Sequence, residues 1–207
     1  FQPRNLNQRM QHWRSKWLPA SLDWGYRALR PWLFRKDAEA AHEQMLAVVS
    51  RIRQSPLLLK LLEATALPNP ESLKTRIWGR TLPSPIGLAA GFDKDGRIYN
   101  PLFLLGFGFV EVGTVTPRPQ PGNPKPRLFR LPEDEALINR LGFNNQGAEA
   151  LQQRLTRQPP QGFLGINLGK NKDTPLEHAV EDYERGLEAL YFHADYLVLN
   201  ISSPNTE

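Results

Sequence analysis

The chain has 207 residues, of which 26 are Lys or Arg and 21 are Asp or Glu, giving a formal net charge of +5. Its 40% hydrophobic and 23% charged residues are typical of a globular protein. The sequence has no Cys, which excludes disulfides, thiolate metal ligands and a cysteine nucleophile from these residues. No apolar run approaches the length of a transmembrane helix. We expect a piece of a longer protein, because the sequence starts at Phe1 without Met and stops at Glu207 just after a polar stretch.

The first 36 residues are strongly basic, with eight Lys or Arg against one acidic residue, Asp23. Four of the five Trp also fall here, at Trp13, Trp17, Trp24 and Trp32. Basic residues mixed with Trp suit a membrane interface. A solvated basic arm whose Trp side chains pack on the domain, or a targeting peptide, would have the same composition.

Residues 21–67 are predicted to form helices after a basic, Trp-containing extension at residues 1–20. Apolar residues share one face in the first segment and again after Asp37, the expected N-cap of the second. The third segment begins at Ser55 and Pro56 and is more apolar than a surface helix requires, so we expect it to bury against a partner domain or lipid. The two apolar faces comprise Leu22, Tyr26, Leu29 and Leu33, and then Ala41, Met45, Val48, Val49 and Ile52.

Beyond a Pro-containing linker at residues 68–74, residues 75–207 alternate short apolar runs with helical stretches. The predicted strands are 86–92, 109–115, 163–168 and 196–201, with helices near 97–105, 147–157 and 175–192. Buried β runs that alternate with helices favour parallel βα units, and four units make half of a (β/α)8 barrel of about 250 residues. A doubly wound fold is disfavoured because the Gly-rich stretch at 106–108 precedes its strand. The predicted fold is therefore α/β: about the first half of a TIM barrel, preceded by a helical segment.

The residues that follow each predicted strand are the candidate site, because the active site of a parallel barrel forms where the strands end. They are small and polar at 89–96, 113–116, 167–171 and 200–205, with a further Asn-rich loop at 139–145. An Asn amide donates and accepts hydrogen bonds, which matches a flat heterocycle such as a pyrimidine or a flavin ring. Lys94 suits a carboxylate or a reduced flavin. Any single Asn could instead serve a turn, but repetition at several strand ends favours a site.

These stretches resemble the class 2 dihydroorotate dehydrogenases, whose barrel carries very similar motifs. The similarity covers most of residues 85–206, and several long, ordered motifs make it specific. They are GLAAGFDKDG at 87–96, GTVTPRPQPGN at 113–123, KPRLFR at 125–130, INRLGFNN at 138–145, GINLGKNKDT at 165–174 and NISSPNT at 200–206. The departures are Glu207, where the family usually has Pro or a small residue, and residues 1–20, which match nothing in it.

The resemblance implies an enzyme of UMP biosynthesis that oxidises (S)-dihydroorotate to orotate through flavin mononucleotide (FMN) and passes the electrons to a membrane quinone. FMN contacts are implied at Ala90, Gly91, Phe92, Asp93, Lys94, Thr114, Asn167 and Asn200. Substrate contacts are implied at Lys94, Asn139, Arg140, Leu141, Gly142, Phe143, Asn200 and Asn205. No metal site is expected.

Ser203 is the implied catalytic base, which removes the proton from carbon 5 of dihydroorotate while hydride leaves carbon 6. Class 1 enzymes place Cys at this position, so Ser favours class 2, which reduces quinone. An isolated hydroxyl is a poor base at neutral pH and needs a proton path, an oriented dipole or a loop that excludes water. Outside this motif, Ser203 would be a turn hydroxyl before Pro204.

The family's N-terminal helices form a hydrophobic entrance for quinone, which suits the Leu-rich segment within residues 21–67. His42 and Arg130 match positions at that quinone end, and a helix-surface His and an ion-paired surface Arg are the alternatives. We expect a monomer at the surface of the bacterial inner (cytoplasmic) membrane, or alternatively of the mitochondrial inner membrane, with no nucleic-acid partner. The family's second half supplies further flavin and orotate contacts, so this chain alone is expected to be inactive and poorly behaved.

Two other functions stay open at this point. One is another FMN-dependent barrel oxidoreductase that acts on a pyrimidine, which the N-terminal helices disfavour. The other is a non-catalytic membrane-binding module formed by residues 1–66. Liposome binding by those residues, without dihydroorotate-dependent quinone reduction by the completed protein, would favour the module.

Overall fold

A four-stranded parallel sheet forms the centre of the molecule, whose computed structural model describes residues 23–65 and 71–201. Its order is β3-β4-β7-β8, so neighbours in the sheet are also successive parallel strands along the chain. A doubly wound sheet reverses its strand order at a switch point, and the described strands show no reversal. The strands are β3 (Gly87–Leu88), β4 (Phe109–Val115), β7 (Phe163–Leu168) and β8 (Tyr196–Leu199).

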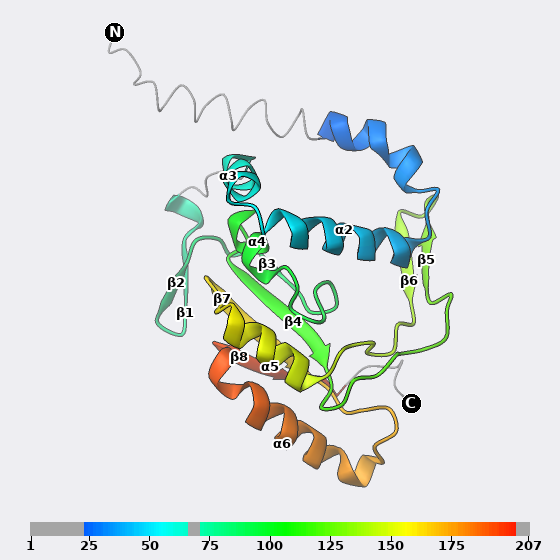
Figure 1. Cartoon of the computed structure of the whole chain (residues 1–207), viewed down its shortest axis with the longest axis vertical. Coiled ribbons are helices and arrows are strands. Elements are labelled where there is room, and N and C mark those ends of the chain that lie inside the picture. Colours follow the sequence, from blue (N-terminus) through cyan, green and yellow to red (C-terminus); the bar gives the residue numbers. More distant parts are fainter. Residues whose placement is uncertain (1–22, 66–70, 202–207) are drawn as a thin grey trace.

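Three helices connect these strands and cover one face of the sheet, and Figure 1 shows two of them, α5 and α6, side by side on that face. They are α4 (Tyr99–Leu104), α5 (Ala148–Arg157) and α6 (Ala179–Leu190). Short 3₁₀ turns flank α6 at Leu176–His178 and Tyr191–His193. The sequence therefore predicted the alternation of strands and helices correctly, with β3 and β8 shorter than expected.

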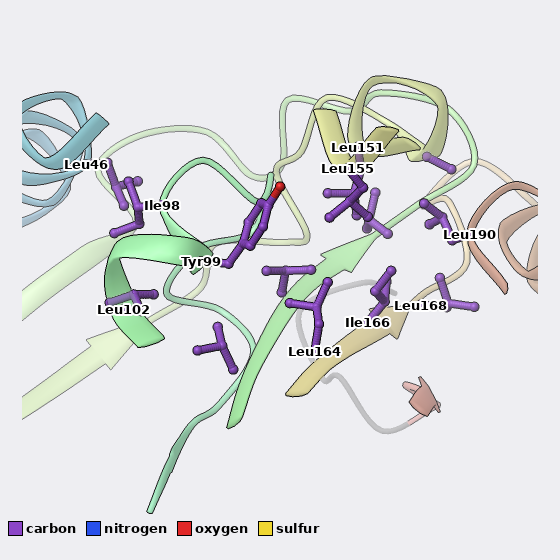
Figure 2. Close-up of a cluster of buried hydrophobic side chains, with 14 residues drawn as sticks. Leu46, Ile98, Tyr99, Leu102, Leu151, Leu155, Leu164, Ile166, Leu168 and Leu190 are labelled. Carbon is purple, nitrogen blue, oxygen red and sulfur yellow. The ribbon is translucent and has the colours of Figure 1, made fainter. Parts of the chain in front are cut away.

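The hydrophobic core lies between the helices and the sheet (Figure 2). Leu151 and Leu155 of α5 pack in the same buried cluster as Leu164 and Ile166 of β7. The opposite face carries the stacked rings of Phe163 and Tyr196 near the strand starts and is polar further along, where Glu111 of β4 and Asn167 of β7 share a hydrogen bond of 2.9 Å. One face of the sheet thus stabilises the fold and leaves the other to line a site.

Two antiparallel hairpins stand beside the parallel sheet, and neither was predicted. The first joins β1 (Thr75–Ile77) to β2 (Arg80–Leu82) through Trp78 and Gly79, both with positive φ, 48° and 77°. The second joins β5 (Leu128–Leu131) to β6 (Ala136–Asn139). Two consecutive positive φ angles are typical of a tight hairpin turn, but Trp is an unusual residue there, so no sequence signal marked it. A 3₁₀ turn, Glu71–Leu73, lies in the predicted linker.

Within the described residues 23–65, three helices precede the first hairpin: residues 23–33, α2 (Ala38–Ile52) and α3 (Pro56–Thr65). The Asp37 cap is confirmed, because a side-chain oxygen of Asp37 accepts a hydrogen bond of 2.9 Å from the Ala40 amide. α2 contributes Leu46 to the core and lies next to the β5 strand (Figure 1).

The Leu-rich helix α3 presents apolar side chains to solvent, with Leu57 69% exposed and Leu61 54% exposed. On the helix at 23–33, Trp24 is 75% exposed, and Leu29 of the predicted apolar face is 58% exposed. The burial expected for the Leu-rich segment is therefore not supplied by the described residues. None of the helices in the described ranges has the length and apolar character needed to cross a membrane.

Candidate active site

A pocket of about 430 Å³ opens where β3 and β4 end and brings together most of the predicted site residues. Four segments wall it: the loop after β3, the end of β4, the β5-β6 hairpin with its following loop, and helix α2. Its lining residues are His42, Ala90, Gly91, Phe92, Lys94, Thr114, Leu128, Leu137, Asn139, Leu141, Gly142 and Phe143. Predicted flavin contacts, substrate contacts and the quinone-site candidate His42 therefore share one cavity.

Lys94 supplies a positive charge to this pocket. Its ammonium donates a hydrogen bond of 2.6 Å to the Asn144 side-chain oxygen. Burial, reinforced by the nearby positive charge of Arg127, lowers the pKa of Lys94 to about 8. The side chain is therefore mainly protonated at neutral pH and can pair with an anionic group in the cavity.

The wall after β3 is formed by closely apposed backbone. Gly91 has a φ of +103°, and its amide donates a hydrogen bond of 2.7 Å to the Gly113 carbonyl at the end of β4. A Cβ added to Gly91 would meet no atom within 4 Å and would project into open space. The glycine thus satisfies a backbone geometry that other residues rarely adopt and leaves room for a flat ring.

A network of buried and half-buried polar side chains lies beside the pocket, on the face of the sheet opposite the helices. The Thr114 hydroxyl donates to the Asn167 side-chain oxygen at 2.6 Å, and the Asn200 amide donates to both of these residues at 3.1 and 3.3 Å. The other end of the Asn167 amide donates to Glu111, which also accepts from the Tyr196 hydroxyl at 3.1 Å. Burial and the neighbouring carboxylate of Glu111 raise the pKa of Tyr196. Strands β4, β7 and β8 therefore place three predicted flavin contacts in one network.

Asp93 was predicted to contact the cofactor, but its side chain points into the protein. It is fully buried, and its two carboxylate oxygens accept hydrogen bonds of 2.7 Å from the amides of Arg97 and Ile98. Burial raises the pKa of Asp93 despite these hydrogen bonds. The carboxylate thus fixes the start of α4, and the Asp93 carbonyl accepts from the amides of Gly96 and Gly113 at 3.2 and 3.5 Å.

The loop at 139–145 divides into residues that face the pocket and residues that do not. Asn139, Leu141, Gly142 and Phe143 line the cavity. Arg140, a predicted substrate contact, instead donates to the Pro126 carbonyl at 3.0 Å.

Sequence reasoning did not single out two further amides of this loop. Asn144 accepts from Lys94, and Asn145 is buried and joins the end of β4 to the loop through Thr116 at 2.9 Å. The density of Asn in the loop was the available signal, but it could not show which amide faces which partner.

The two quinone-site candidates lie in adjoining cavities. The His42 ring packs edge-on against Phe92, with ring centroids 5.0 Å apart. Arg130 lines a separate pocket of about 390 Å³, stacks on Phe34 and donates to the Lys36 carbonyl at 2.6 Å. Leu137 lines both cavities, so they adjoin at this side chain.

The remaining predicted residues, Ser203 and Asn205, lie outside the described residues, as does the extension at 1–20. Within residues 23–65 and 71–201, no cluster of three or more His, Cys, Asp or Glu could bind a metal ion.

A family model described as dihydroorotate dehydrogenase matches residues 72–207. The chain belongs to the dihydroorotate dehydrogenase family. Enzymes of this family depend on a flavin, and the cavity at the ends of β3 and β4 lies within the matched residues.

Two relatives named dihydroorotate dehydrogenase (quinone) illustrate the similarity. The protein of Alkalilimnicola ehrlichii is 55% identical over 181 residues, and that of Bordetella pertussis is 56% identical over 185 residues. These alignments cover 87% and 88% of this chain and 52% of each relative. The chain thus spans about half the length of these dihydroorotate dehydrogenases.

A solved structure shares the fold. The dihydroorotate dehydrogenase of Eimeria tenella in complex with ferulenol superposes with a TM-score of 0.70 at 41% identity, covering 83% of this chain and 45% of that chain. The ligand-free enzyme of the same organism gives a TM-score of 0.63 at 44% identity and covers 72% of this chain and 45% of that chain.

Proposed function

We propose that this chain belongs to a quinone-dependent dihydroorotate dehydrogenase, which oxidises (S)-dihydroorotate to orotate in UMP biosynthesis and delivers the electrons to a membrane quinone. The observation that carries the proposal is the single cavity that joins the Lys94 ammonium, the Asn139 loop and the glycine wall at Gly91 to His42 of α2. Relatives with more than half of the aligned residues identical carry the name of this activity.

The sheet β3-β4-β7-β8 is proposed to be the first half of a (β/α)8 barrel. Its strands follow one another without reversal, its helices cover one face, and the polar face would become the barrel interior. Residues 75–207 then form four βα units, and residues 21–67 form the helical segment at the quinone side.

The residues present fit FMN as the flavin. A ring against the wall at Gly91 would meet backbone rather than side chains, because the position of the missing Cβ is open. Thr114, Asn167 and Asn200 together provide hydrogen-bond donors and acceptors at neighbouring strand ends, which suits the edge of an isoalloxazine ring. When bound, FMN supplies an acceptor for hydride from the substrate and a donor of electrons to the quinone.

The chain's own groups would orient the pyrimidine and move its proton. The Lys94 ammonium pairs with the substrate carboxylate, and Asn139 lies across the same cavity to bind the pyrimidine edge. Ser203, in the segment after β8, takes the proton from carbon 5, and Asn205 is proposed to bind the substrate beside it. A proton path, an oriented dipole or a loop that excludes water would assist this step.

The quinone is proposed to approach from the side of α2, where His42 packs on Phe92, with Arg130 further out next to Leu137. The exposed Leu residues of α3 and Trp24 suit contact with a membrane surface, proposed to be the bacterial inner membrane.

The test compares electron acceptors in the full-length protein. Dihydroorotate oxidation should be rapid with a ubiquinone analogue and slow with fumarate or NAD. Ser203→Ala should lower the rate of flavin reduction by at least about 100-fold, because a general base contributes roughly that much. Full turnover in the Ser203→Ala variant would remove Ser203 from its role, and a preference for fumarate or NAD would refute the quinone assignment.

A further inference from the structure

A buried ion pair joins helix α2 to the segment before β5. Glu39, in the first turn of α2, is 8% exposed, and Arg127, 88 residues away in the sequence, is 6% exposed. The Arg127 guanidinium donates to the Glu39 carboxylate at 2.6, 3.0 and 3.2 Å. This hydrogen bonding lowers the pKa of Glu39, and the more exposed Lys125 forms a further ion pair with the same carboxylate at 3.3 Å.

The same guanidinium also forms hydrogen bonds on the side of the pocket that carries the loop at 139–143. Its remaining terminal nitrogen donates to the carbonyls of Pro121 and Asn123 at 2.6 and 2.9 Å. Asn123 in turn donates from its backbone to the Leu141 carbonyl and from its side chain to the Arg140 carbonyl, at 3.0 and 2.9 Å. The Arg127 side chain therefore reaches the loop that carries Asn139 to Phe143 through Asn123, and the Arg127 carbonyl also accepts a hydrogen bond of 2.9 Å from the Arg140 amide.

The opposite wall of the pocket depends on Glu39. His42 lies three residues after Glu39 on α2, so both side chains occupy one face of the helix. A second ion pair on that face, Glu43 with Arg97 at 2.7 Å, has side chains that are 53% and 26% exposed. A solvated pair contributes little, whereas breaking a buried one leaves an uncompensated charge, so the Glu39 contact is the stronger constraint on α2.

We propose that Glu39 and Arg127 are positioning residues that set the separation between the pocket wall carrying His42 and the wall carrying residues 139–143. The inference rests on the proposed function, in which the first wall faces the quinone and the second faces the pyrimidine. The Arg127 guanidinium contacts both walls, whereas Glu39 belongs to one of them. Substituting Arg127 should therefore have a different effect from substituting Glu39. Loss of Glu39 affects α2 alone, whereas loss of Arg127 affects both walls and, among the described residues, leaves Glu39 with only the more exposed Lys125, at 3.3 Å.

The test measures the two half-reactions of the full-length holoenzyme separately, by anaerobic stopped-flow absorbance of the flavin. One arm follows flavin reduction by dihydroorotate, and the other follows reoxidation by a short-chain ubiquinone. Glu39→Gln should raise the KM for quinone about tenfold while flavin reduction changes less than about twofold, since small misplacements of binding groups are costly. Arg127→Met should slow both arms. Glu43→Gln is the matched control on the same helix and should change neither arm by more than about twofold.

A folding defect is separated from the proposed role by a second variant. The double substitution of Glu39→Met with Arg127→Met removes both charges and keeps the buried volume, so the protein should fold and retain flavin. It should still show both kinetic defects. Normal half-reactions in the folded double variant, or equal effects of Glu39→Gln on both arms, would overturn the inference. Failure of dihydroorotate to reduce the flavin of the unmodified enzyme would instead refute the proposed function.

Discussion

At the scale of single residues, Lys94 is a buried cation in the pocket that can pair with an anionic ligand. Its ammonium donates to the neutral amide of Asn144, so its charge is available to an anion that enters the pocket. The lowered pKa also has a consequence for stability. The folded chain binds fewer protons than the unfolded chain between pH 8 and the ordinary Lys value, so the contribution of Lys94 to stability increases with pH across that window.

The pKa of Lys94 predicts a pH dependence of orotate binding in the full-length enzyme. Only the protonated amine pairs with a carboxylate, so the Kd for orotate should increase above about pH 8, approaching about tenfold per pH unit. Titration of the flavin absorbance with orotate between pH 6 and 10 measures this. Lys94→Met should bind weakly with a flat profile, while Lys74→Met, an exposed lysine paired with Glu71, should retain the normal profile. A flat profile in the unmodified enzyme would refute the role of Lys94.

The sequence identified the types of residue at the site better than their orientation. Asn at successive strand ends indicated a polar site, and Asn167 and Asn200 join in one hydrogen-bonded network because residues that end parallel strands lie at one edge of the sheet. The sequence could not show that Asp93 turns inward to bind the amides of Arg97 and Ile98. It also could not pair Glu39 with Arg127, since contacts between residues distant in sequence depend on the packing of α2 against the segment before β5.

At the scale of elements, strand prediction succeeded where burial was complete. β4 and β7 have the predicted bounds because their apolar runs are buried, whereas the hairpin strands of three and four residues are partly exposed and follow no clear alternation. Helix α2 was predicted from its cap and its apolar spacing. Local signals of this kind determine where a helix begins, and tertiary contacts determine which face it buries.

The N-cap of α2 gives a prediction on stability. Asp37→Ala should lower the free energy of unfolding by about 1 kcal/mol, because the Ala40 amide loses its side-chain acceptor. Asp37→Asn should keep most of that stability, since Asn is an equally good N-cap. Urea denaturation of the three full-length proteins measures the difference, and equal losses in both variants would show that the capping hydrogen bond contributes nothing.

Gly165 in the middle of β7 gives a second prediction at this scale. A Cβ at this position would lie 2.1 Å from the Tyr196 ring on β8, so Gly165→Ala should destabilise the protein by about 1–3 kcal/mol through overpacking. The loss should shrink when Tyr196→Ala makes space, because the two positions share one contact. Thermal unfolding of the two single variants and the double variant tests this, and simply additive losses would contradict it.

At the scale of the whole molecule, the described parallel sheet is open. β8 pairs only with β7, and β3 pairs only with β4, among the strands in residues 71–201. Unpaired strand edges invite association with other chains. A closed barrel would pair both edges and would cover the polar face that carries Glu111 and Asn167.

We therefore predict that residues 1–207 produced alone associate and retain FMN poorly. Light scattering and flavin absorbance at increasing protein concentration measure both properties. The same chain extended through the second half of the barrel should remain monomeric with about one FMN per chain, because closure removes both edges. A monodisperse 207-residue protein with stoichiometric flavin and turnover would refute the half-barrel assignment.

The hydrogen bond between Gly91 and Gly113 affects how the ligand preference of such a site can change among related proteins. The wall beside these glycines consists of main-chain atoms, so replacing side chains around it can alter the preferred ligand or acceptor without changing the wall. New specificities should therefore arise from residues such as Leu137, Asn139 and His42, which face the same cavity from other segments. The surface that binds the ring would stay constant while the preferred ligand or electron acceptor changed.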